Sequence, residues 1–145
     1  MGLFKNVANF VTGGAAEVQV SLVNPVLGDE HVLTASINVK PTGDTIHAKR
    51  LYLIVQAVEE SSTANQLFSE EYIIEEGLQV NSGDQKEWTY EINLPSHVSP
   101  TYLAKHFSVK WMIKAALDMP GIDPNSGWQP FVLNKEIAIE NLRGE

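Results

Sequence analysis

The sequence contains no cysteine, which excludes disulfide bonds, thiolate catalysis and cysteine-ligated zinc or iron–sulfur sites. Basic residues are also few: ten lysines and arginines stand against eighteen acidic residues, giving a formal net charge of -8. A field of that sign repels phosphate backbones, so nucleic acid is not an expected partner. There is neither an apolar run of the roughly 20 residues that span a bilayer nor the pattern of a secretory signal. We therefore expect a protein of the reducing cytoplasm.

What the 145 residues do contain is a series of segments in which apolar and polar side chains alternate. Trp88, Tyr90 and Ile92 fall on one face of an extended segment that stops at Leu94-Pro95. A second, longer alternation covers residues 107–117, after a Ser-Pro crossing at 99–100. A period of two is typical of half-buried strands.

Five further strands are predicted between strong turn signals, over residues 17–22, 33–40, 51–58, 68–75 and 131–139. The segment 51–58 is apolar on both faces, which predicts a strand covered on both sides. The less regular segment 68–75 is predicted to be an edge. About seven strands without a long helical pattern predict an all-β, immunoglobulin-like antiparallel sandwich, formed by residues 13–145 as a single domain.

Residues 1–12 carry the one helical pattern, a short amphipathic segment whose apolar arc includes Phe4, Val7 and Phe10. Helices this short are marginal alone, so the apolar arc needs a surface to lie on. Two alternatives stay open: packing on the chain's own sandwich or a sister subunit, and contact with a partner protein or membrane. A single lysine in the segment, with the charge of -8, counts against an anionic membrane.

Residues with catalytic or metal-binding chemistry do not form a recognisable motif. The four histidines lack short metal-ligand spacing, and adjacent glutamate pairs point to opposite faces of a strand. We therefore predict no catalytic residues, no cofactor and no metal. The nearest approach to a metal site is the oxygen-rich turn with Asp118, Asp123 and Asn125, which lacks the third acid and terminal glutamate of a calcium loop. Side chains that stabilise a tight turn are the alternative interpretation.

Several motifs follow one another in a set order: Asn-Pro-Val-Leu-Gly-Asp-Glu at 24–30, Ala-Lys-Arg-Leu-Tyr-Leu-Ile-Val at 48–55, Trp-Thr-Tyr-Glu-Ile-Asn-Leu-Pro at 88–95, Ser-Pro-Thr-Tyr at 99–102 and Val-Lys-Trp-Met-Ile-Lys-Ala-Ala-Leu-Asp at 109–118. This order resembles the N-terminal sandwich of the arrestin superfamily. Met-Gly-Leu-Phe-Lys-Asn-Val at 1–7, Gly-Gly-Ala-Ala-Glu-Val at 13–18 and Ile-Asp-Pro at 122–124 are similar, more narrowly, to the bacterial sporulation-control proteins of the Spo-zero-M type. With this resemblance, residues 88–118 are interpreted as a hairpin of an arrestin-like domain.

The resemblance implies a non-enzymatic, cytoplasmic regulator or scaffold that binds other proteins through sheet edges and sandwich faces. We expect contacts at Phe4, Val7 and Phe10, and at the first strand through Val18 and Val20. Because such proteins carry two sandwiches in tandem and this chain has room for one, a homodimer is a further hypothesis. The alternative function is a sandwich that binds a small ligand or carbohydrate on an exposed aromatic ring such as Trp128.

Overall fold

The computed structural model describes residues 14–28 and 31–134, and every regular element in these ranges is a β-strand. The predicted helix at residues 1–12 lies outside them. The strands are β1 (Ala16–Leu22), β2 (Val26–Leu27), β3 (Val32–Pro41), β4 (Ile46–Glu60), β5 (Ala64–Val80), β6 (Lys86–Asn93), β7 (Tyr102–Leu103), β8 (Ser108–Asp118) and β9 (Gln129–Leu133). Each of the seven longer ones overlaps a predicted strand, but β9 ends at Leu133, and residues 135–139 of the predicted strand at 131–139 lie outside the described ranges. β2 and β7 are two-residue additions.

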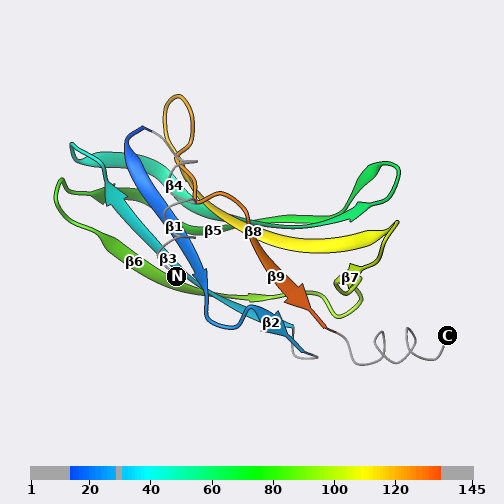
Figure 1. Ribbon diagram of the computed structural model, residues 1–145. Helices are drawn as coiled ribbons and strands as arrows, with labels where there is room; N and C mark the ends of the chain where they lie inside the picture. Colours follow the sequence, from blue (N-terminus) through cyan, green and yellow to red (C-terminus); the bar gives the residue numbers. More distant parts are fainter. Residues whose placement is uncertain (1–13, 29–30, 135–145) are drawn as a thin grey trace.

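The strands form a sandwich of two sheets (Figure 1). The smaller sheet has the order β1-β3-β6, and the larger has the order β2-β9-β8-β4-β5, with β7 paired to β8. All of these pairings are antiparallel except that of β2 with β9. In Figure 1 the β4–β5 hairpin and the start of β8 project beyond the smaller sheet, so only part of the larger sheet is covered by it.

The core lies between the two inner faces and is built by strict alternation. Leu33, Ala35, Ile37 and Val39 of β3 are completely buried, whereas the residues between them are only partly buried. The alternation predicted from the sequence is therefore confirmed, and with it the all-β sandwich. Its physical basis is that successive side chains of a strand point to opposite faces.

The predicted hairpin between the segments at 88–94 and 107–118 is wrong. β6 pairs with β3 in the smaller sheet, whereas β8 pairs with β4 and β9 in the larger one. Residues 94–107 cross between the sheets, and the crossing is anchored by two backbone carbonyls. Ser99 O accepts a hydrogen bond from Trp111 Nε1 at 2.8 Å, and Leu133 O accepts one from Thr101 N at 2.8 Å.

β5 is an edge strand, as predicted, and it is much longer than the predicted segment at 68–75. It pairs with β4 from Ile46↔Val80 to Glu60↔Ala64, with register shifts beside Leu51 and Ala57. Such bulges bend a strand and increase its twist. The long hairpin can therefore curve around the core instead of running straight past it.

Candidate functional site

The outward side of the larger sheet carries an unusual number of apolar side chains. In β4 the residues at odd positions from Leu51 to Ala57 are buried, so Tyr52, Ile54 and Val58 point outward and stay partly exposed. Register places further residues on the same face, because partners in a ladder share a face. We call this set the outer apolar face: Val26, Tyr52, Ile54, Val58, Ile73, Met112, Trp128 and Val132.

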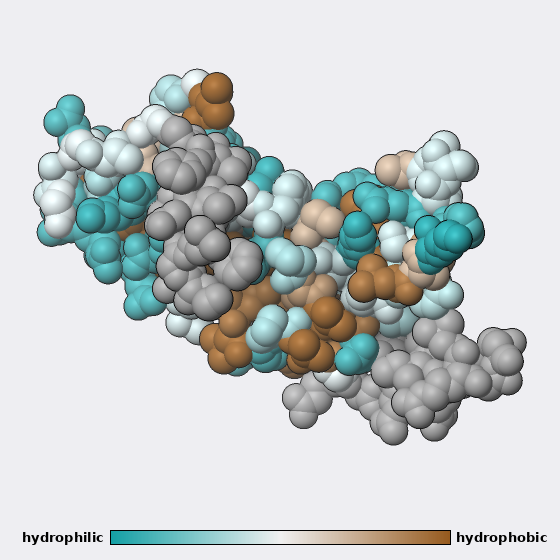
Figure 2. Space-filling model, viewed as in Figure 1, coloured by the Kyte–Doolittle hydropathy of each residue, from teal (hydrophilic) through white to brown (hydrophobic). Residues whose placement is uncertain are grey.

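The outer apolar face is open to solvent within the described residues, where the two sheets form the only layers. Val26 is 59% exposed, Ile73 43% and Trp128 40%. Figure 2 shows apolar side chains gathered over β2 and β9, where Val26 pairs with Val132. Antiparallel sheets ordinarily turn polar residues toward water. An apolar outward face is the pattern of a surface that contacts another molecule.

Within this face, only Tyr52, Ile54 and Val58 of β4 were expected from the sequence to be covered, whereas Trp128 was expected to be exposed. Because residues 51–58 are apolar on both faces, we predicted cover on both sides, and this prediction is wrong for the described structure. The smaller sheet covers only one face of β4. The two-faced apolar pattern was a signal of a contact surface, but a strand buried on both sides gives the same pattern, so sequence alone does not separate them.

Ion pairs lie at both ends of the outer apolar face. At one end Arg50 Nε is 3.3 Å from Asp118 Oδ2, and Arg50 Nη2 is 3.8 Å from Glu71 Oε2. At the other end Lys110 Nζ is 3.2 Å from Glu60 Oε1. Such half-exposed pairs add little stability. Charged and polar side chains also lie within the face, because Glu71 and Lys114 are the ladder partners of Ile54 and Gln56 is that of Met112. Apolar and charged side chains therefore alternate across this surface.

Trp128 is exposed, as the carbohydrate-binding alternative requires, but its indole is not free. Lys114 Nζ lies 4.7 Å from the ring centroid, a cation–π distance. One face of the ring is therefore occupied, and a sugar could stack on the other face alone. The other two tryptophans differ: Trp111 is 1% exposed, and Trp88 is partly buried.

The oxygen-rich turn places Asp118, Asp123 and Asn125 in separate structural roles. Asp118 pairs with Arg50, and Asp123 accepts hydrogen bonds from Tyr52 Oη at 2.7 Å and from Met119 N at 3.2 Å. Asn125 Oδ1 accepts a bond from Gly127 N at 2.8 Å, which closes an Asx turn. No group of three or more His, Cys, Asp or Glu residues with metal-binding geometry occurs in the described ranges.

The Tyr52–Asp123 contact predicts a specific pH dependence. Burial, the hydrogen bond to Asp123 and the nearby carboxylates raise the pKa of the Tyr52 hydroxyl above its ordinary value of about 10. The folded state thus holds this proton more tightly than the unfolded state, so the stabilisation is complete below about pH 10 and is lost as the pH rises further. Tyr52→Phe is therefore expected to lower the free energy of unfolding more at pH 8 than at pH 11.

Urea unfolding of both proteins at the two pH values measures this difference. Tyr102→Phe is the control, because the Tyr102 ring stacks with Phe107 at a centroid distance of 5.6 Å and phenylalanine keeps that contact. If the loss of unfolding free energy caused by Tyr52→Phe stays constant or grows between pH 8 and pH 11, the stabilising role given to the Tyr52–Asp123 hydrogen bond is contradicted.

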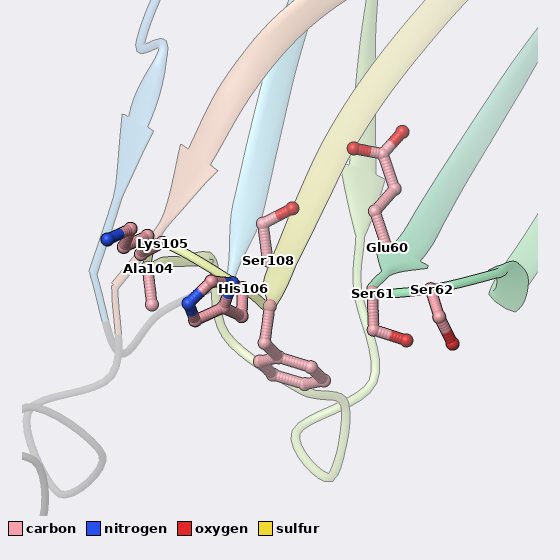
Figure 3. A pocket seen from close by; sticks show the side chains of 8 residues that line it. Glu60, Ser61, Ser62, Ala104, Lys105, His106 and Ser108 are labelled. Carbon is pink, nitrogen blue, oxygen red and sulfur yellow. The ribbon is translucent and has the colours of Figure 1, made fainter.

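A second feature is an open cleft of about 570 Å3 at the tip of the β4–β5 hairpin. Ser61 and Ser62 line one side of it, and Lys105 and His106, from the turn between β7 and β8, line the other (Figure 3). Among the described residues, no hydrogen bond joins His106 to a neighbouring serine. The arrangement is a polar surface hollow, and it lacks the coupled nucleophile and base that covalent catalysis uses.

The predicted contact residues fall into two groups. Phe4, Val7 and Phe10 lie outside the described residues. Val18 and Val20 belong to β1, which is an edge of the smaller sheet as predicted, but their side chains are 0% and 9% exposed. Val18 and Val20 therefore face the core, and the exposed parts of β1 are its backbone edge and its outward side chains such as Ser21.

One buried polar residue connects two distant segments. His31, one of the four histidines without metal-ligand spacing, is 4% exposed and has a φ of 58°. Its Nδ1–H donates to Pro95 O at 3.1 Å, and its own carbonyl accepts from Leu94 N at 2.9 Å. His31 thus joins the start of β3 to the start of the crossing segment. No local pattern predicts a partner 64 residues away.

Comparison with known proteins identifies the architecture. No protein-family model matches the chain, and no curated protein matches it by sequence. Among solved structures, the sporulation control protein Spo0M from Bacillus subtilis matches with a TM-score of 0.68 over 90% of this chain. The two proteins share a fold.

That fold is arrestin-like, which confirms the resemblance inferred from the order of motifs. The sequence identity is 17%, and the match covers 56% of the Spo0M chain. The present chain thus spans little more than half the length of that protein.

Proposed function

We propose that this chain is a non-enzymatic regulatory or scaffold module that binds a folded partner protein with its outer apolar face. The observation that carries the proposal is the row of outward-pointing apolar side chains on β4, formed by Tyr52, Ile54 and Val58, with Met112 of β8 beside it. Such a row has no role in the sandwich core, since the opposite faces of the same strands form that core. Its exposure lowers solubility unless it has a contact partner.

Charge and fold support this proposal in different ways. The net charge of -8 favours protein surfaces over nucleic acid as partners. The shared fold with a protein named for sporulation control supports a regulatory role. The proposed location is the cytoplasm. In the described part of the chain, no helix has the length and apolar character needed to cross a bilayer.

The test is a charge substitution at the centre of the face. Met112→Lys places a charge where a partner would exclude water, and it is expected to weaken capture of partner proteins at least tenfold, because a desolvated charge at the centre of an interface costs several kcal/mol. The matched control is Thr89→Lys, at an exposed position of β6 with ladder partner Ser36 in the smaller sheet. Quantitative mass spectrometry of proteins captured by the wild type and both variants gives the readout.

Selective loss with Met112→Lys supports the outer apolar face as the contact surface. Equal recovery with Met112→Lys and wild type would exclude this face, as would equal losses with the two variants. Circular dichroism and thermal unfolding establish beforehand that both variants remain folded.

A further inference from the structure

The side of the sandwich between β5 and β6 combines two unpaired strand edges. Within the described residues, β5 pairs only with β4 and β6 pairs only with β3. The two strands approach each other across the sandwich: Trp88 Nε1 donates to Glu75 Oε1 at 2.8 Å, and the rings of Tyr72 and Tyr90 are 6.4 Å apart. Side chains bridge the two sheets here, while the backbone edges stay free.

The β5 edge is the longer of the two. β5 has 17 residues and β6 has eight, so the β5 edge continues well past its neighbour. A row of unpaired N–H and C=O groups of this length is a template for an added strand. Strand addition supplies affinity through the main chain and leaves selectivity to the side chains that alternate along it.

The side chains along this edge are acidic and aromatic. Glu70, Glu71, Glu75 and Glu76 are all exposed, and among them Glu71 alone has an ion-pair partner in the described residues, Arg50 at 3.8 Å. The partly buried rings of Tyr72, Trp88 and Tyr90 lie along the same side. Carboxylates beside aromatic faces attract lysine and arginine side chains through charge and through cation–π contacts.

The environment of Tyr72 supports this geometry. Burial is the main cause that raises the pKa of its hydroxyl, and the negative charge of Glu70 adds to the effect. Glu70 therefore lies close enough to Tyr72 for its charge to act on the ring hydroxyl. A cationic side chain placed between them would contact a carboxylate and an aromatic ring together.

We propose that the free edge of β5 binds an extended, lysine- or arginine-rich segment of a partner protein as an additional strand of the larger sheet. A second copy of this chain fits less well, because pairing two β5 strands would set their glutamates against each other. This surface adjoins the outer apolar face, to which Ile73 of β5 belongs, but it uses the backbone edge and the glutamates of β5. The two proposals are tested by different variants, and either can fail without the other.

The probe is a fluorescein-labelled ten-residue peptide in which lysine and threonine alternate. Two matched peptides serve as controls: one has glutamate in place of lysine, and the other is N-methylated at every second residue, which removes the donors of one edge. Binding is followed by fluorescence anisotropy, and hydrogen exchange reports which backbone amides become protected. We expect the lysine peptide to bind and to protect amides within residues 64–80, with affinity that falls as salt rises.

Two double variants with the same change in charge are compared. The β5 variant is Glu70→Gln/Glu75→Gln. The control is Glu17→Gln/Asp44→Asn, in which Glu17 belongs to β1 and Asp44 to the loop after β3. Glutamine at position 75 keeps an acceptor for Trp88 Nε1. The β5 variant is expected to bind the lysine peptide about fivefold more weakly, as for the loss of two exposed ion pairs. The control is expected to change affinity less than about twofold, because neither Glu17 nor Asp44 is a residue of β5.

Three results would overturn the proposal. The first is equal binding of the N-methylated peptide, which would show that only diffuse charge attracts the lysine peptide. The second is equal weakening by the two paired variants. The third is a dimer, by light scattering, in which the β5 amides are already protected without peptide; the occupant of the edge would then be a second copy.

Discussion

Replacing Trp111 with alanine is expected to lower the free energy of unfolding by about 4 kcal/mol, in the range for large aromatic residues removed from a core. Trp111 is 1% exposed, and its ring lies 5.2 Å from that of Phe68 and 5.9 Å from that of Phe131. The indole thus joins β5, β8 and β9 on the inner face of the larger sheet. Alanine would leave a cavity among strands that are held in place by their ladders.

A second loss adds to the cavity. Trp111 Nε1 donates to Ser99 O on the crossing segment, and the substitution leaves that carbonyl without this partner. Trp128→Ala is the matched control, expected to cost clearly less because the Trp128 side chain is already 40% exposed and lies against Lys114 outside the core. Urea unfolding curves measure both, and similar costs for the two variants would contradict the assignment of Trp111 to the core.

Ser126→Ala is expected to cost about 2 kcal/mol, an unusually large effect for the removal of one hydroxyl. Ser126 is 2% exposed and lies beside Ala115 of β8, just before the start of β9. Its Oγ accepts from Ala115 N at 3.0 Å, and its N–H donates to Ala115 O at 2.9 Å. Without the hydroxyl, a buried N–H in β8 loses its acceptor.

The effect should be local as well as global. The Ala115 amide should exchange its hydrogen faster in Ser126→Ala, and the loop that carries Asp123 and Trp128 should lose protection with it. Ser36→Ala provides the control, since Ser36 Oγ donates to Glu87 on an exposed face, where water can replace the lost bond. An unchanged Ala115 exchange rate together with a cost below about 0.5 kcal/mol would show that water substitutes for the hydroxyl.

The sequence predicted the strands well because alternation is a local property. Leu33 to Val39 show their buried face without reference to any other part of the chain. The pairing of strands is not local, and for this reason the hairpin between residues 88–94 and 107–118 was wrong. Both strands alternate cleanly, and nothing in either indicates that one joins β3 and the other joins β4.

The candidate site was predictable only in part. The edge position of β5 followed from the irregular alternation of residues 68–75, and the exposure of Trp128 followed from its loop. The outer apolar face did not follow, because Ile54 and Val58 have the composition of a doubly covered strand. The approach of Trp88 to Glu75 depends on how two sheets stack, which no spacing in the sequence encodes.

The crossing of residues 94–107 between the sheets also has a consequence for the order in which the chain folds. β4 and β5 are joined by a three-residue turn and can pair at once. β8 reaches β4 only after some fifty intervening residues have been brought into place, and β6 reaches β3 across a similar separation. Folding becomes slower as such distant pairings accumulate, and β-sandwich proteins fold in about milliseconds to seconds. Until then, the β4–β5 hairpin is the part of the larger sheet that can form first. The charges of its acidic edge then also protect it from pairing with other incompletely folded chains.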